Sequence, residues 1–482
     1  MSTVTNPVST GFAPSHPAPF AHPRRMAAIA AILGVDPPEV AGATVVELGC
    51  ADAANLLSIA AADPSLTAIG VDPSAAAIER ARTVAEAAGL TGATLTEGAA
   101  AQADDGTADF VIASDVLSRV DAEARAAVLA EAARVARPGG LVMLSYDAIP
   151  GAVGRLFSRS IGRRAAAAEI EAGDAEGARV AAVSALRAAA RNGAAGPDFV
   201  ALATSEAERL AQLSADRVLH HELAEHWEPL TVSELATQAA AQGLAYLGEL
   251  TPADRWRERF AEAEVRRIVG LAGKPSPALQ QQVVDDMLGP ASHASLFVRG
   301  AAPKEPIGGG ARRPAGPAAA EWHVTIEHAG DWPELPIHLT AVGSQVRGAG
   351  PAGLSIAEIT ERTGVLADTA RQAASTLDAA GLVRLSLSPP AGAMAPGDQP
   401  HLSALALAQL RLGQSMLTSL RHREVSVGDP RMRELLLLVD GTRDRAAIRA
   451  ALEASTTEGV AELASSVDDL LEQFAAAGLL TA

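Results

Sequence analysis

The sequence predicts an α/β protein whose N-terminal part forms a doubly wound parallel sheet and whose remainder is mostly helical. Short apolar runs alternate with amphipathic helical segments between residues 43 and 146. The pattern then turns helical over 152–230, and two further helical blocks follow residue 321. A regular strand–helix alternation places consecutive strands in parallel, with helices on both faces of the sheet. At 482 residues the chain is long enough for roughly three domains.

Composition narrows the class of protein further. The chain holds 39 basic and 57 acidic residues, a net charge of −18, and 48% of its residues are apolar. Its charged fraction of 20% is too low for a disordered polyelectrolyte. The single cysteine, Cys50, excludes an internal disulfide and a cysteine-based zinc site. No apolar run approaches the roughly 20 residues that span a bilayer. We therefore expect a soluble, cytoplasmic protein without a membrane partner.

The N-terminal elements follow from periodicity and from the residues that begin and end helices. Residues 1–22 are rich in Pro, Ser and Thr, which predicts a flexible tail. Pro23 suits the first position of a helix, whose apolar residues share one face. Gly89 ends a later helix. The expected strands are 43–48, 67–71, 93–96, 110–113 and 141–146, and the helices between them are 53–62, 74–88 and 122–136.

The later elements complete one domain and begin another. A helix over 232–243 ends in glycine and leads into a strand over 244–250, and a last strand is expected over 295–299. Residues 301–321 contain three consecutive glycines and several prolines, which is typical of a linker. The expected domains are therefore 23–300, with a helical insertion at about 152–230, and 322–482.

The C-terminal domain has the element order of a winged helix. Helices over 355–364 and 366–381 lead into a strand over 382–387, and a second helical block over 432–478 ends in a similar sequence. Residues 330–482 hold twelve arginines against eighteen acids. This negative balance is unfavourable for binding nucleic acid, so we expect contacts with protein instead.

The segment that carries chemistry lies at the end of the first strand. Glu47 and Gly49 end that strand in a tight turn, and a helix begins directly afterwards. The next strand ends in Asp72, 23 residues beyond Gly49. A carboxylate there can accept both hydroxyls of a ribose, each at about 1.5–3 kcal/mol. This is the nucleoside site of a doubly wound sheet, at the carboxyl ends of its strands.

The charges around this turn select the kind of nucleoside. A dinucleotide site needs a Gly-x-Gly-x-x-Gly arrangement, but here the first glycine stands alone. Glu47 and Asp52 place negative charge where a pyrophosphate would lie. Residues 1–150 hold eight arginines against seventeen acids, half of the excess negative charge of the chain. The site therefore favours a cationic ligand.

These residues resemble the class I S-adenosylmethionine-dependent methyltransferases, which have a Rossmann-like sheet. Four runs narrow the likeness to the methyltransferases that carry a regulatory domain: 19–25 (PFAHPRR), 47–50 (ELGC), 145–151 (SYDAIPG) and 243–249 (GLAYLGE). Some members of that family are bacterial protein-lysine methyltransferases with a C-terminal winged-helix domain. The resemblance implies S-adenosylmethionine as cofactor and a protein side chain, lysine above all, as acceptor. It also implies that the insertion at 152–230 is a helical regulatory region above the sheet, where an acceptor would be held.

The site residues follow from the motif and from the resemblance together. Tyr146 and Asp147 come directly after the fifth strand, where the methyl group would point, and are the expected catalytic residues that orient the acceptor. The residues expected to bind the cofactor are Glu47, Gly49, Cys50, Ala51, Asn55, Asp72, Pro73 and Ser114. His221 and His226 are five positions apart and so do not share a helix face, and no metal site is expected.

Departures from the family pattern leave alternatives open. Ala51 and Ala53 stand where glycines are usual, which crowds the loop, and the turn after the fourth strand lacks the usual His-Gly. Glu97 is the nearest acid to the position that commonly contacts the adenine. Three functions therefore remain: a protein methyltransferase, a small-molecule or saccharide methyltransferase, and a non-catalytic scaffold that keeps the fold. The sequence does not determine the acceptor or the oligomeric state.

Overall fold

A computed structural model provides the structure of the protein. It describes residues 14–192, 194–251, 255, 260–273, 276–301, 322–327, 330–457 and 459–481. The expected linker lies outside the described residues except for residue 301, and so do the first thirteen residues of the expected tail. Within the described residues, no helix combines the length and apolar character needed to cross a bilayer.

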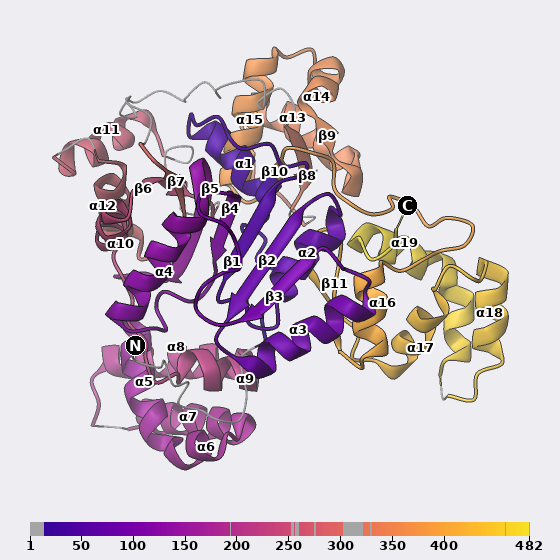
Figure 1. Ribbon diagram of the computed structural model, residues 1–482, viewed down its shortest axis with the longest axis horizontal. Helices are drawn as coiled ribbons and strands as arrows, with labels where there is room; N and C mark the ends of the chain where they lie inside the picture. The colour runs from indigo at the N-terminus through magenta and orange to yellow at the C-terminus, as the bar shows by residue number, and fades with distance from the viewer. Residues whose placement is uncertain are drawn as a thin grey trace.

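A seven-stranded sheet forms the centre of the molecule (Figure 1). Its strands are β1 (Thr44–Leu48), β2 (Thr67–Asp72), β3 (Ala93–Glu97), β4 (Ala108–Ala113), β5 (Ala136–Asp147), β6 (Leu244–Glu249) and β7 (Ser292–Arg299). Their order is β3-β2-β1-β4-β5-β7-β6, and the first five are parallel, as the alternation predicts. In contrast, β7 runs antiparallel to both of its neighbours. It fills the gap between β5 and β6 from the opposite direction, so the sheet as a whole is mixed.

Helices cover both faces of this sheet. On one face, α1 (Pro23–Ile32), α2 (Ala54–Ala62) and α3 (Ala75–Ala87) pack on β1, β4 and β5. On the other face lie α4 (Ala122–Val135), α10 (Val232–Ala241) and α12 (Pro277–Leu288). A further helix, α11 (Glu262–Leu271), packs on α12. The two apolar cores hold the sheet rigid, so its carboxyl edge is a fixed platform for a site.

The predicted helical insertion begins directly after β5. It consists of α5 (Val153–Ala165), α6 (Ala167–Ala172), α7 (Ala175–Ala190), α8 (Pro197–Gln212), α9 (Ala215–Arg217) and a π-helix (Val218–Glu222). These helices share a small apolar core of their own. Figure 1 shows them grouped at one end of the sheet. Since α5 follows the carboxyl end of β5, this is the end at which the site residues lie.

The residues of the expected C-terminal domain, 322–482, can be described in two parts. The first part has strands β8 (His323–Ile326), β9 (Leu354–Ser355) and β10 (Val383–Ser386) and helices α13 (Ile337–Gly348), α14 (Ile356–Thr363) and α15 (Ala367–Ala379). Its apolar residues join the core that contains α1. The second part has α16 (Ala404–Arg411), α17 (Pro430–Leu438), α18 (Arg445–Glu453), α19 (Val467–Ala477) and a hairpin of β11 (Met416–Thr418) and β12 (Glu424–Ser426). Most of its apolar residues form another core, while Leu405 and Ala408 of α16 belong to the core that contains α1.

A buried ion cluster joins the first of these parts to the sheet domain. Asp378, on α15, has no exposed surface and lies between two guanidinium groups. Arg25, on α1, donates to one carboxylate oxygen at 2.5 Å, and Arg255 donates to the other. The backbone N–H of Leu385 also donates to Asp378, at 2.9 Å. The cluster therefore fixes α1 against the first C-terminal part.

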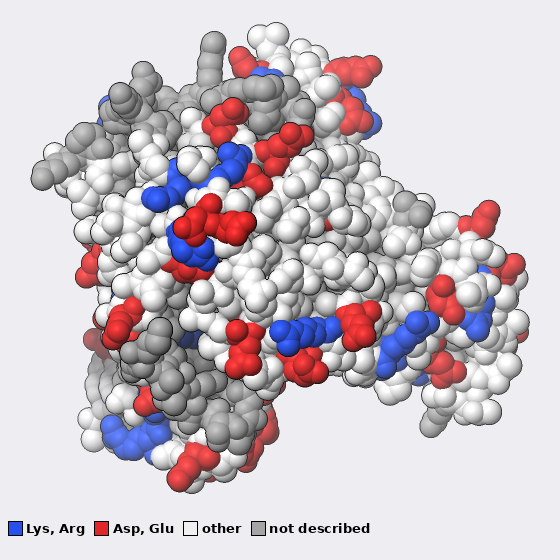
Figure 2. Space-filling model, in the orientation of Figure 1, with Lys and Arg blue, Asp and Glu red and all other residues white. Residues whose placement is uncertain are grey.

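On the face shown in Figure 2, acidic and basic side chains lie close to one another, and much of the area carries neither.

Candidate active site

The loop after β1 keeps a backbone that normally requires glycine. Gly49 has φ +72°, and the two alanines that follow, Ala51 and Ala53, have φ +48° and +56°. A Cβ on Gly49 would come within 2.4 Å of the side chain of Val116. The left-handed conformation costs an L-residue other than glycine roughly 1–2 kcal/mol. The loop therefore has a backbone conformation that suits glycine, and the two alanines make this conformation strained.

This strain gives a prediction for Ala51, which is half-buried. Changing Ala51 to Gly is expected to raise the free energy of unfolding by about 1 kcal/mol, because glycine adopts positive φ without strain. The control is Ala127→Gly, at an exposed position in the middle of α4, which is expected to lower it by about 0.5–1 kcal/mol. Thermal unfolding of both variants measures the difference. Equal destabilisation by both changes would mean that Ala51 is not strained.

Asp72 connects the ends of β1 and β2. One of its carboxylate oxygens accepts the N–H of Ala51 at 2.8 Å, and the other accepts the N–H of Ser74 at 2.8 Å. Burial raises the pKa of Asp72, with a smaller contribution from the nearby Asp52. Each oxygen of a carboxylate has a second lone pair. Asp72 therefore shapes the loop and retains the capacity to accept ligand hydroxyls.

Glu47 is a buried acid, and only one of its two carboxylate oxygens accepts a hydrogen bond from a described residue. It is 2% exposed, and Asn55 donates its side-chain amide to one oxygen at 2.9 Å. The other oxygen has no partner among the described residues. Burial raises the pKa of Glu47 to about 8. An orphaned acceptor beside Asp52 and Asp72 fits a ligand that carries positive charge, which is the charge character of S-adenosylmethionine.

The raised pKa of Glu47 predicts a pH dependence of stability. Between pH 4.5 and about 8 the folded chain holds a proton that the unfolded chain has released, so the free energy of unfolding falls as the pH rises. The loss is at most about 1.4 kcal/mol for each pH unit. The Glu47→Gln variant cannot ionise, so its advantage over the wild type should grow between pH 5 and pH 8. Thermal midpoints measured across this range test it, and a constant difference would contradict it.

The segment 14–22 is not a flexible tail, contrary to the expectation from its composition. The hydroxyl of Ser15 accepts the N–H of Ala54 at 2.7 Å and thereby caps α2. The same hydroxyl and the backbone N–H of Ser15 donate to Asp52 at 2.8 and 2.7 Å, and the N–H of Ala18 donates to Asn55 at 2.9 Å. Proline restricts the unfolded chain, so fixing this segment costs less entropy than its composition suggests. We call residues 14–22 the strap.

The other expected cofactor residues lie around the same loop. Cys50 is buried, and its sulfur occupies the space left by Gly70, where a Cβ would come within 2.9 Å. Burial raises the pKa of the Cys50 thiol well above its usual value. Pro73 is exposed after β2. Ser114, after β4, lies 3.5 Å from the hydroxyl of Ser145. The structure thus brings these residues to one edge of the sheet, and their binding roles stay predictions.

The two expected catalytic residues have other partners in this structure. The hydroxyl of Tyr146 lies 3.2 Å from that of Ser295, and the side chain is 1% exposed. Arg155 donates to one oxygen of Asp147 at 2.5 Å, and Trp227 donates to the other at 2.6 Å. Asp147 therefore joins the sheet to the helical insertion. Roles for Tyr146 and Asp147 in orienting an acceptor stay predictions.

Asp115 is a further candidate site residue, which the sequence did not identify. It follows β4 with φ +59°, and its carboxylate lies 3.6 Å from Arg119 and 3.8 Å from Arg217. Burial favours a raised pKa, but the charges of these two arginines outweigh it, so the pKa of Asp115 lies below its usual value. Burial likewise lowers the pKa of His221 to about 2, which leaves its ring neutral. The sequence does contain a signal for this residue, because aspartate is among the residues that tolerate positive φ. The spacing of motifs along the chain does not show that Asp115 adopts it.

Three family models match consecutive parts of the chain. A methyltransferase domain matches residues 45–140, a predicted methyltransferase regulatory domain matches 214–299, and a PKMT C-terminal winged helix domain matches 398–473. The chain therefore combines, in this order, a methyltransferase domain, a predicted methyltransferase regulatory domain and a PKMT C-terminal winged helix domain. The match to the regulatory domain includes β6 and β7, and it overlaps the expected helical insertion at 152–230 over residues 214–230.

Solved structures and curated proteins resemble the chain to different extents. PKMT2 from Rickettsia typhi has a TM-score of 0.78 at 16% identity, covering 98% of this chain and 100% of that one. Its complex with AdoHcy has a TM-score of 0.77 at 16% identity, covering 97% and 99%. The uncharacterized protein RP789 of Rickettsia prowazekii is 30% identical over 28% of this chain, and RP028 of the same organism is 28% identical over 30%. These matches span 25% and 60% of the two curated relatives.

The described residues give no indication of a metal centre. No group of three or more His, Cys, Asp or Glu among them could hold a metal ion.

Proposed function

We propose that the protein transfers a methyl group from S-adenosylmethionine to a protein side chain, with lysine as the favoured acceptor. The observation that carries this proposal is the loop after β1, whose left-handed alanines and bond to Asp72 preserve a nucleoside-binding shape. The methyltransferase and PKMT winged-helix models support the class of reaction and the class of acceptor. The full-length likeness to a structure described as PKMT2 supports the same domain arrangement.

The residues around the loop would hold the cofactor by their charges and acceptors. Asp72 would accept the ribose hydroxyls, and Glu47 would ionise next to a positive group. Gly49, Cys50 and Ala51 would form the wall of the pocket, while Asn55 holds Glu47 in place at 2.9 Å. Pro73 and Ser114 would border it. When bound, S-adenosylmethionine supplies an electrophilic methyl group on a sulfonium sulfur.

A lysine acceptor makes one further demand on the site. The amine must be neutral to react, and deprotonating it at pH 7 costs about 4.6 kcal/mol from a pKa near 10.4. Asp115 lies at the carboxyl end of β4 with its side chain 43% exposed, and it would attract and orient the ammonium as it arrives. The proton would then pass to solvent before transfer, because an ionised carboxylate favours the charged form of the amine. Asp147, held by Arg155 and Trp227, would keep the insertion in position above it. Transfer then depends mainly on orientation, which can supply roughly 7–11 kcal/mol.

Two other functions remain as alternatives. A small-molecule or saccharide acceptor would use the same cofactor residues. A non-catalytic scaffold would not need them, and the preserved backbone of Ala51 and Ala53 disfavours it, because strain kept in a loop indicates a use for its shape.

Labelling with tritiated S-adenosylmethionine in a lysate distinguishes these functions. The wild-type protein should transfer label to protein, and hydrolysis should release methylated lysine. The Asp72→Ala variant should label nothing, and Glu86→Ala, which changes an exposed acid on α3, should behave like the wild type. Label only in small metabolites or saccharide would favour the second function. Absence of label from every fraction would favour the scaffold.

We further propose a cytoplasmic location. The free, buried Cys50 and the lack of a second cysteine are compatible with a reducing compartment. Cell fractionation tests this, and recovery in a secreted or membrane fraction would contradict it.

A further inference from the structure

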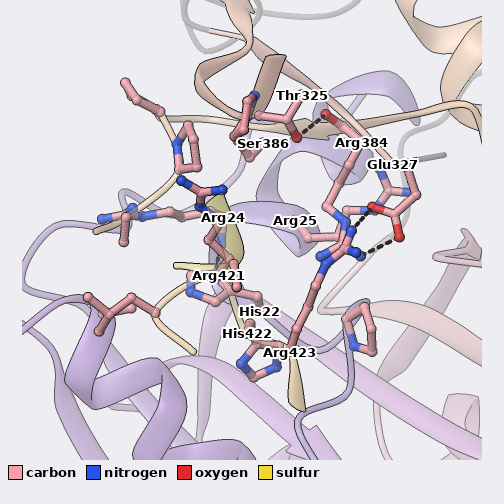
Figure 3. A pocket seen from close by; sticks show the side chains of 18 of the residues that line it. His22, Arg24, Arg25, Thr325, Glu327, Arg384, Ser386, Arg421, His422 and Arg423 are labelled. Atoms are coloured by element: carbon pink, nitrogen blue, oxygen red, sulfur yellow. Dashed lines mark hydrogen bonds and ion pairs between the residues drawn. The ribbon is translucent and has the colours of Figure 1, made fainter. Parts of the chain in front are cut away.

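A cavity of about 430 Å³ lies where the strap and α1 meet both C-terminal parts. Its walls come from residues 19–25, from β8 and the turn after β10, and from the hairpin of β11 and β12 (Figure 3). Its volume is within the range of pockets that hold small molecules. Its location is separate from the loop after β1 that forms the candidate cofactor site.

The cavity gathers positive charge in an acidic protein. It is lined by five arginines and only two acids: Arg24, Arg25, Arg384, Arg421 and Arg423 against Glu327 and Glu424. Arg384 and Arg423 share Glu327, at 2.8 and 2.5 Å, as Figure 3 shows. Glu424 is bound to His16 of the strap at 2.7 Å.

The remaining arginines of the cavity differ in whether a carboxylate neutralises their charge. Arg24 and Arg25 pair with Asp63 and Asp378, which lie outside the cavity lining. Arg421 has no carboxylate partner among the described residues. It donates only to a backbone carbonyl of α19 and to the sulfur of Met394. The cluster therefore has more positive charge than its neighbours neutralise.

Two buried polar atoms of the lining also lack partners. The Nε of Arg421 and the hydroxyl of Ser388 are buried and make no hydrogen bond with any described residue. Leaving a buried donor unpaired is unfavourable, and it is more unfavourable when the donor belongs to a charged group. Burial, followed by the neighbouring Arg423, lowers the pKa of the Arg421 guanidinium, which is the direction expected for a cation without a counter-ion. Such groups call for an additional partner in the cavity.

We propose that this cavity binds a phosphate-bearing small molecule of nucleotide size. Guanidinium groups bind phosphate through paired N–H donors, and a doubly charged anion matches an excess of more than one positive charge. The apolar part of the lining, which includes Pro19, Pro389 and Leu420, suits an organic ring rather than a bare ion. The ligand would join α1, the first C-terminal part and the hairpin, because each contributes at least one arginine.

Calorimetric titration of the full-length protein with AMP tests this proposal. S-adenosylhomocysteine is kept at saturation so that AMP cannot occupy the nucleoside site at β1 and β2. Adenosine and inorganic pyrophosphate are titrated separately. We expect AMP to bind, pyrophosphate to bind more weakly, and adenosine not to bind. Raising the salt concentration should weaken the binding of both phosphates.

Substitutions in the lining of the cavity test whether AMP binds there. Arg423→Gln, at an exposed residue, should weaken AMP binding about 10-fold or more, and Arg421→Gln should do the same. Arg266→Gln, in an exposed pair on α11, is the matched control and should leave it unchanged. Because Arg421 also binds the backbone of α19, thermal unfolding must confirm that its variant is folded. No heat with AMP or pyrophosphate, or equal affinity in wild type and Arg423→Gln, would overturn the proposal. Asp72→Ala should bind AMP normally, so failure here is distinguishable from failure of the cofactor site.

Discussion

Replacing Asp72 with alanine is expected to weaken the binding of S-adenosylmethionine at least about 100-fold. Hydrogen bonds to a charged group are worth about 1.5–3 kcal/mol each, and the carboxylate would accept two ribose hydroxyls. The change also removes the acceptor of the N–H groups of Ala51 and Ser74, so the loop would lose its fixed shape. Calorimetric titration of the purified variant with the cofactor measures the loss.

Two variants separate binding from damage to the fold. Asp72→Asn keeps a carbonyl oxygen as acceptor and should have an intermediate affinity. Glu79→Ala removes an exposed acid from the next helix, α3, and should bind like the wild type. If Asp72→Ala binds the cofactor with unchanged affinity, the ribose is held elsewhere.

Replacing Asp378 with alanine is expected to give the largest loss of stability. The change leaves the guanidinium groups of Arg25 and Arg255, which are 4% and 5% exposed, without their shared carboxylate. Breaking a buried ion pair by removing one partner costs about 3–5 kcal/mol. The N–H of Leu385 also loses its acceptor. Hydrogen exchange of the β10 amides should show the opening free energy fall by this amount.

The matched control for this change lies on the same helix. Asp368→Ala removes an acid whose side chain is 66% exposed and which pairs with Arg371 at 2.7 Å. Its effect should be within about 1 kcal/mol, as for other exposed pairs. Comparable effects of the two substitutions would show that the buried cluster does not hold α1 against α15.

Much of the sheet could be predicted because local sequence determines it. Short apolar runs bounded by turn residues predicted β1, β2, β4 and β5. Gly89 predicted the end of α3. Parallel strands present their carboxyl ends at the same edge of a sheet. This edge therefore holds Glu47, Gly49 and Asp72.

The remaining features depend on contacts between distant segments. The strap is fixed because Ser15 meets the start of α2, 39 positions away, and composition does not reveal such a contact. β7 pairs with β5 and β6 in the antiparallel direction, and the strand alternation between residues 43 and 146 does not extend to this pairing. The partners of Asp147, Arg155 and Trp227, come from the insertion, so spacing along the chain could not show that its oxygens are occupied. The arginine-lined cavity likewise combines three segments that are far apart in sequence.

The most direct test of the cofactor site is a crystal structure of the protein with S-adenosylhomocysteine. The account predicts that the ribose hydroxyls contact the carboxylate of Asp72 and that the loop of Gly49, Ala51 and Ala53 keeps its positive φ angles around the ligand. A ligand that lies away from the carboxyl ends of β1 and β2, or a loop whose alanine methyl groups exclude it, would contradict the account.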